Sequence, residues 1–124
     1  MDPADALYPL PDAELSRKRR ELARHTAAAF RDFSRQVFEA GALDAKTKQL
    51  IAVAVAHVTQ CPYCIRSHTD GALAAGATEP EVMEAIWVAA EMRAGGAVAH
   101  SVIALDAMAR RSTRPAAPSP PRAP

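Results

Sequence analysis

Residues that start and stop helices recur along this chain and constrain its fold more than any other feature. Asp12 and Asp44 are of a type that caps helix N-termini, and Pro62 suits a first helical turn, where no N–H donor is needed. Residues 78–81, Thr-Glu-Pro-Glu, form a capping box with proline in its first turn. No segment alternates apolar and polar residues as a strand does. The sequence therefore predicts an all-α fold, a bundle of about five to six helices.

The same residues predict where the helices lie. An apolar stripe of helical spacing runs from Leu15 to Val37, which indicates one bent helix or two shorter ones from residue 12 to a stop at Gly41. Residues 44–60 should form a buried helix, because alanines interrupt their β-branched run. Further helices are expected over 62–76, from 78 to a break or kink at 95–96, and over about 97–109.

The composition limits how this chain is organised. Its 124 residues suit one domain, and with 49% apolar but only 5% aromatic residues the core must be mainly Ala, Val, Leu and Ile. We expect a helical domain over residues 12–110. Three prolines mark residues 1–11 as an extended arm, and five mark residues 111–124 as a disordered tail.

Charge and hydropathy exclude two classes of partner. The net charge of +1 does not favour nucleic acid, and the basic cluster at residues 17–20 has glutamates beside it, as on a solvated helix face. No apolar stretch is long enough to span a bilayer, and the acidic beginning does not resemble a signal peptide. We therefore expect a cytoplasmic protein.

Candidate chemistry is concentrated in residues 57–68, which hold both cysteines and two of the four histidines. Cys61 and Cys64 have the spacing of a redox-active dithiol, and His68 lies one helical turn after Cys64. The pair begins a predicted helix, where free backbone N–H groups favour a thiolate, so at least one thiol pKa should be lowered. His68 would then orient, protonate or deprotonate Cys64. This dithiol chemistry needs no cofactor or metal.

Other interpretations of the same residues stay open. His57, Cys61, Cys64 and His68 are suitable zinc ligands for a non-catalytic binding or assembly module, although the usual long loop between ligand pairs is missing. The cysteines could also be buried and inert. His57 either faces the thiols or caps helix carbonyls, and His100 either takes part in catalysis or is satisfied at a helix interface.

Two stretches carry a family resemblance: residues 43–68 (LDAKTKQLIAVAVAHVTQCPYCIRSH), and the helix from 76–85 (GATEPEVMEA) to 92–96 (MRAGG). Together they resemble the carboxymuconolactone decarboxylase family, in its alkylhydroperoxidase D-like branch with a Cys-x-x-Cys redox site. The resemblance implies a helical fold assembled into trimers or hexamers. It also implies thiol-dependent reduction of a hydroperoxide at the expense of a thiol or dithiol donor. Cys64 would attack the peroxide, Cys61 would resolve the product and His68 would serve in a proton relay.

One position departs from that family pattern. The redox branch has a proton-accepting glutamate twelve residues before the first cysteine, and here that residue is Gln49, which cannot take up a proton. Either the activity is weak or another group replaces the glutamate. Glu91 is expected to be the buried, functional carboxylate, with Glu84, His57 and His100 as further candidates. A decarboxylase, which in this family lacks the cysteine pair, is less favoured.

The expected homo-oligomer also has a basis in the residues. The predicted helix that begins at residue 78 has more apolar surface than one core contact needs, because it carries Met83, Trp87 and Met92. They either fill the protomer's own core or bury against other copies of the chain.

Overall fold

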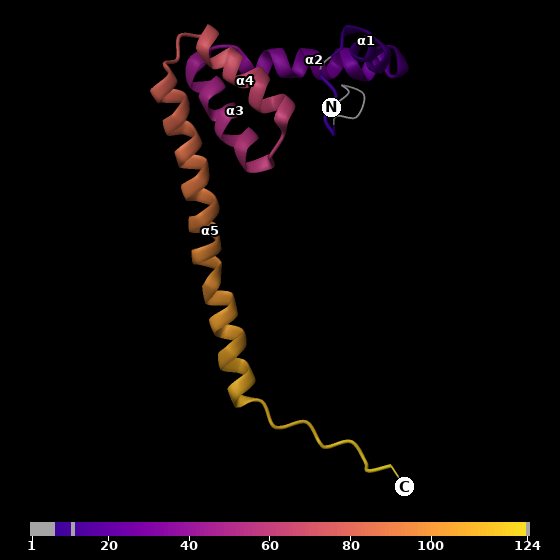
Figure 1. Ribbon diagram of the computed structural model, residues 1–124, viewed down its shortest axis with the longest axis vertical. Coiled ribbons are helices and arrows are strands. Elements are labelled where there is room, and N and C mark those ends of the chain that lie inside the picture. Colours follow the sequence, from indigo (N-terminus) through magenta and orange to yellow (C-terminus); the bar gives the residue numbers. More distant parts are fainter. Residues whose placement is uncertain (1–6, 11, 124) are drawn as a thin grey trace. The chain divides into compact units, whose positions relative to one another are not determined.

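The computed structural model describes residues 7–10 and 12–123, and this part of the chain contains five α-helices and no strand (Figure 1). The all-α prediction is confirmed. The helices are α1 (Ala13–Leu22), α2 (Arg24–Phe38), α3 (Ala45–Thr59), α4 (Pro62–Ala74) and α5 (Glu79–Thr113). The chain divides into two compact units, Met1–Ala90 and Glu91–Pro124.

The helices begin where the capping residues predict. The Asp12 and Asp44 carboxylates each accept a backbone N–H bond of 2.7 Å, and Pro62 opens α4. In the capping box, the Glu81 N–H donates to Thr78 Oγ1 at 3.2 Å and the Thr78 N–H donates to Glu81 Oε1 at 3.0 Å. These bonds satisfy N–H groups that a helix start leaves without partners.

The N-terminal helical region consists of two helices, as one of the two alternatives predicted. Ala23, with φ −147° and ψ 62°, separates α1 from α2. The predicted stop at Gly41 is wrong, because α2 ends at Phe38 and Glu39 is already extended.

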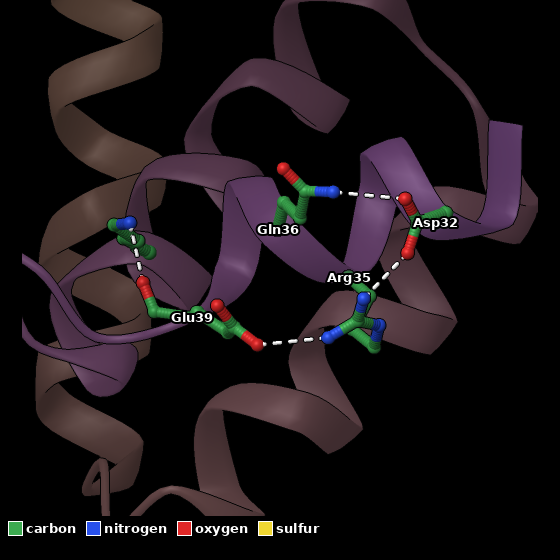
Figure 2. A network of polar contacts seen from close by, with 5 residues as sticks. Asp32, Arg35, Gln36 and Glu39 are labelled. Atoms are coloured by element: carbon green, nitrogen blue, oxygen red, sulfur yellow. Dashed lines mark hydrogen bonds and ion pairs between the residues drawn. The ribbon is translucent and has the colours of Figure 1, made fainter. Parts of the chain in front are cut away.

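Lys48 of α3 explains this earlier end of α2. Its ammonium group donates to the backbone carbonyl of Val37 at 2.8 Å and to that of Glu39 at 2.5 Å. It thereby satisfies carbonyls that the end of a helix leaves free. Figure 2 shows the bond to the Glu39 carbonyl together with the ion pairs of Arg35 with Asp32 and Glu39, which brace the same end of the helix.

The predicted interruption at Gly95 and Gly96 is wrong, because α5 is one continuous helix of 35 residues. Glycine in a helix interior costs about 1 kcal/mol relative to alanine, but it keeps its N–H donor. Proline, which would remove that donor, occurs only at the two ends of this segment, as Pro80 and Pro115. Good helix formers around the glycines therefore carry the helix through.

The hydrophobic core of the first unit lies between α3, α4 and the beginning of α5. Helices α3 and α4 run side by side (Figure 1). The buried cluster comprises Val53, Ala72, Ala77 and Val82, against which Leu50 and Ile86 pack. These are the residue types that the composition predicts. The expectation of a buried α3 holds for one face only, since Ile51 and Val55 are about half exposed.

The two ends of the chain are described in part. Of the arm predicted for residues 1–11, residues 1–6 and 11 lie outside the described residues. Within residues 7–10, the Pro9 carbonyl accepts a hydrogen bond of 2.9 Å from the Tyr63 hydroxyl of α4, and the ring of Tyr8 meets Tyr63 edge-on. Residues 114–123 form neither helix nor strand, and no described helix has both the length and the apolar character needed to cross a membrane.

Candidate redox site

Cys61 lies at the N-cap of α4 and Cys64 in its first turn. Both cysteines are free and half-buried. The two Sγ atoms are 2.9 Å apart, and Cys61 Sγ also accepts the backbone N–H of Cys64 at 3.4 Å. A disulfide bond has a length of about 2.05 Å, so a movement of about 1 Å would join the two sulfur atoms.

The two thiols differ in acidity because they share one hydrogen bond. The hydrogen bond between the two thiols, followed by the backbone N–H groups of Cys64 and Tyr63, lowers the pKa of the Cys61 thiol below its ordinary value. The same hydrogen bond, together with burial, raises the pKa of Cys64. The thiol whose pKa is lowered, as expected of at least one of the pair, is therefore Cys61.

His68, one turn beyond Cys64, is held from two sides. Its Nδ1 lies 2.9 Å from the side-chain oxygen of Gln49 on α3. The ring of Phe38, at the end of α2, stacks on the imidazole with the ring centroids 5.0 Å apart and the planes 23° apart. Three helices thus fix one histidine that could move a proton.

A mainly apolar pocket of about 410 Å³ adjoins the second thiol. Its walls come from α2, α3 and α4, and Cys64 and His68 both line it. Cys61 is not among the lining residues. The remaining lining residues are Val37, Phe38, Lys48, Ile51, Ala52, Val55, Ala56 and Thr59. Cys64 and His68 thus line the same apolar cavity, and their spacing predicts that they share one face of a helix.

His57 is turned to its own helix. Its Nδ1 lies 2.7 Å from the backbone carbonyl of Val53, one turn earlier in α3 and not among the free carbonyls at the helix end. Among residues 7–10 and 12–123, no group of three or more His, Cys, Asp or Glu side chains is placed to hold a metal ion. The four ligands of the zinc alternative are therefore not assembled in this structure.

Glu91 differs most from its prediction. The expected burial is wrong, because the Glu91 side chain is exposed, and its carboxylate lies beside Gly95 of the same helix. The apolar residues around Glu91 in the sequence do not cover it. Glu84 and His100 are also exposed. Glu91 and His100 belong to the second unit, whereas both thiols belong to the first.

Phe38, Lys48 and Gly71 contribute to the site although sequence reasoning did not single them out. Phe38 falls at the very end of a helix, one position past the apolar stripe that ends at Val37. Nothing in the sequence separates Lys48 from an ordinary surface cation. Gly71 lies inside α4, where a Cβ atom would lie 2.6 Å from Gln49 Oε1. A glycine without another explanation inside a helix is the one sequence indication of such a close approach.

Comparisons with known proteins identify a family and related sequences. The sequence profile of the carboxymuconolactone decarboxylase family matches residues 24–107. The chain is also similar to uncharacterized protein 4 in the cox locus of Paracoccus denitrificans, with 66% identity over 77 residues that cover 62% of this chain and 69% of that protein.

Solved structures show the same likeness. A protein from Methanobacterium thermoautotrophicum has a TM-score of 0.64 and 38% identity, covering 67% of this chain and 93% of its own. A carboxymuconolactone decarboxylase family protein from Legionella pneumophila has a TM-score of 0.62 and 32% identity. The match covers 78% of this chain and 87% of the Legionella protein. A third structure is that of a family protein from Thermotoga maritima, described as possibly involved in the antioxidative response. It has a TM-score of 0.50 and 33% identity, and the match covers 52% of this chain and 66% of the Thermotoga protein.

Proposed function

This chain belongs to the carboxymuconolactone decarboxylase family, and we propose that it is a thiol-dependent peroxidase that cycles Cys61 and Cys64 between dithiol and disulfide. The observation that carries the proposal is the sulfur pair itself. Two free thiols lie 2.9 Å apart at a helix N-terminus, one with a lowered and one with a raised pKa. That arrangement supports disulfide formation after a single oxidation of either sulfur.

In the proposed first half of the cycle, Cys64 attacks the hydroperoxide. Its proton passes to His68 or, along the sulfur–sulfur contact, to the Cys61 thiolate. The Cys64 sulfur then bonds to one peroxide oxygen, the O–O bond breaks, and the leaving alkoxide takes a proton to become an alcohol. Cys64 is left as a sulfenic acid.

In the second half, Cys61 resolves the sulfenic acid. Its sulfur attacks the Cys64 sulfur, a disulfide forms, and the hydroxyl group leaves as water after taking up a proton. An external thiol or dithiol donor then supplies two electrons and two protons, which restore the pair. We place this cycle in the cytoplasm, where thiol reductants maintain free cysteines.

The pocket beside Cys64 supports an organic hydroperoxide as the oxidant. Its volume of about 410 Å³ and its apolar walls, to which Ile51, Ala52 and Val55 contribute, suit an alkyl or aryl group. A hydrogen peroxide molecule would leave most of that apolar surface uncovered. Binding of the organic group would place the peroxide oxygens next to Cys64 and His68.

We also propose that the active form is a homo-oligomer, a trimer or hexamer. Met83, Trp87 and Met92 are 50%, 67% and 64% exposed, so within the described chain they do not fill the protomer's core. Phe30 and Phe33 on α2 are 68% and 62% exposed. Aromatic surface of this extent is typical of faces that bury against another protein.

Single-cysteine variants test the proposed cycle. Thiols are counted before and after addition of cumene hydroperoxide, and sulfenic acid is trapped with dimedone. The wild-type protein should lose two thiols per peroxide, whereas Cys61→Ser should accumulate sulfenic acid at Cys64. Trapping at Cys61 in Cys64→Ser at an equal or faster rate would give the attacking role to Cys61. Stoichiometric zinc with no titratable thiol would contradict the redox proposal.

The same assay tests the residues that could replace the proton-accepting glutamate of the family. If Glu91 accepts a proton during catalysis, Glu91→Gln should slow peroxide consumption on the order of 100-fold, the scale of general-base loss. An unchanged rate would remove Glu91 from the mechanism. Corresponding substitutions test His57, Glu84 and His100.

A further inference from the structure

Helices α3 and α4 approach each other closely where Gly71 faces Gln49. A Cβ atom on Gly71 would lie 2.6 Å from Gln49 Oε1 and 2.9 Å from Gln49 Cδ. Real Cβ atoms do not come this close to other heavy atoms. Among the described glycines only Gly76 has a positive φ, so the backbone at position 71 does not itself require glycine. Glycine weakens a helix interior, and here the missing side chain leaves room for the amide of Gln49.

That amide is the partner of His68. Gln49 Oε1 lies 2.9 Å from His68 Nδ1. An amide oxygen can only accept a hydrogen bond, so Nδ1 must carry the proton. In a neutral imidazole the other nitrogen, Nε2, is then unprotonated. Phe38, stacked on the ring, restricts its orientation.

We infer that Gln49 is a positioning residue that holds His68 in the Nδ1–H tautomer, and that Gly71 provides the space in which Gln49 does so. The role of this tautomer in proton transfer rests on the proposed function. Unprotonated Nε2 can receive the proton of the Cys64 thiol and later return it to the alkoxide. Because Gln49 cannot be protonated, the proton stays on His68 between these two steps, whereas a glutamate could carry it further.

The tautomer is measured directly by long-range ¹H–¹⁵N correlation of the full-length protein labelled at histidine nitrogen, at a pH where His68 is neutral. The wild-type spectrum should show Nδ1 protonated and Nε2 unprotonated. Gln49→Leu removes the acceptor, and the His68 signals should move to the Nε2–H form or to an average. Gln49→Glu supplies another acceptor oxygen and should retain the Nδ1 proton.

Gly71→Ala should produce the same spectral change as Gln49→Leu, although the Gln49 side-chain amide is chemically intact in this variant. Gly96→Ala is the matched control, because no atom lies within 4 Å of a Cβ at Gly96, and it should leave the His68 signals unchanged. If Gly71→Ala does not fold, the two Gln49 variants still decide the role of Gln49. An unchanged spectrum in Gln49→Leu would overturn the inference.

Peroxide turnover separates this inference from the function on which it rests. In Gln49→Leu, turnover should fall on the order of 10- to 100-fold, while alkylation of Cys61 stays the same. If the wild-type protein has no peroxidase activity but shows the predicted tautomer, the proposed function fails and the positioning role stands. If wild-type His68 is protonated at Nε2, the positioning role fails whatever the turnover.

Discussion

Phe38 and His68 stack with their ring centroids 5.0 Å apart, although thirty positions separate them in the sequence. The contact brings the end of α2 to the histidine of α4. Lys48 of α3 holds the same end of α2 through the carbonyls of Val37 and Glu39. The orientation of His68 therefore depends on three helices and on an ammonium group that does not touch it in any described contact.

This stacking predicts that Phe38→Ala impairs catalysis through the histidine. Without the ring, His68 gains freedom, and misplacement of a reacting group commonly reduces rates by one to two orders of magnitude. We expect peroxide turnover to fall about 10-fold, with the rate of Cys61 alkylation unchanged. Steady-state peroxide consumption and iodoacetamide labelling provide the two measurements. An equal loss in peroxide turnover and in the rate of Cys61 alkylation would indicate general unfolding.

The two thiols should react with alkylating agents in a fixed order. Because the pKa of Cys61 is lowered and that of Cys64 is raised, iodoacetamide at pH 7 should label Cys61 faster, on the order of 10-fold. Cys64→Ala removes the largest cause of the lowered pKa, so labelling of Cys61 should require a higher pH. Peptide mass spectrometry across pH measures both effects. Preferential labelling of Cys64 would contradict the assignment.

The apolar pocket should set the preference among peroxides. Ala52 lines the pocket, and Ala52→Leu would narrow it. We expect kcat/KM for cumene hydroperoxide to fall by about 10-fold or more, since even one extra methylene group in an apolar pocket is worth about 1–3 kcal/mol. The kcat/KM for hydrogen peroxide should be almost unaffected. Hydrogen peroxide is thus the internal control. A parallel loss for both peroxides would mean that the substitution disturbs the thiols instead.

Acid should destabilise the protein partly through Glu81. Its bonds with Lys46, and with the backbone and side chain of Thr78, lower the pKa of this carboxyl in the folded state. A carboxyl with a lowered folded pKa contributes stability that is present above its unfolded pKa and is lost as the pH falls through its folded pKa. We expect the melting temperature to drop below about pH 4.5.

Glu81→Gln should flatten that acid limb and lower the melting temperature at pH 7. Glu84→Gln, an exposed glutamate on the same helix, is the matched control and should change neither. Thermal melts followed by circular dichroism at several pH values decide the question. An identical acid limb in Glu81→Gln and in the wild type would show that other carboxyls dominate.

The proposed assembly should depend on the exposed aromatic face of α2. Phe30→Glu combined with Phe33→Glu places two charges on that face, and buried unpaired charge is costly at an interface. Light scattering should give a trimer or hexamer mass for the wild type and a smaller species for the double variant. Arg31→Gln, on the same helix, is the control. A monomer mass for the wild type at micromolar concentration would refute the assembly.

Local features of the fold were predictable because they depend on neighbours in the sequence. Asp12, Asp44, Pro62 and the capping box at Thr78 act within one helical turn, so they indicate helix starts without knowledge of the tertiary structure. The continuation of α5 through Gly95 and Gly96 was not predictable in this way. A glycine only weakens a helix, and whether the helix continues depends on the residues on both sides.

Within the site, two thiols at a helix N-terminus with His68 one turn away could be predicted from the sequence, because helix geometry fixes those separations. It also identified Gln49 as the departure from the family pattern. Four features emerge only once the chain is folded: the Gln49 amide lies beside His68, Cys61 has the lower pKa, Phe38 stacks on His68 and Glu91 is exposed. Each of these depends on the distance between side chains from different helices, or on what covers a side chain, and spacing along one helix does not contain that information.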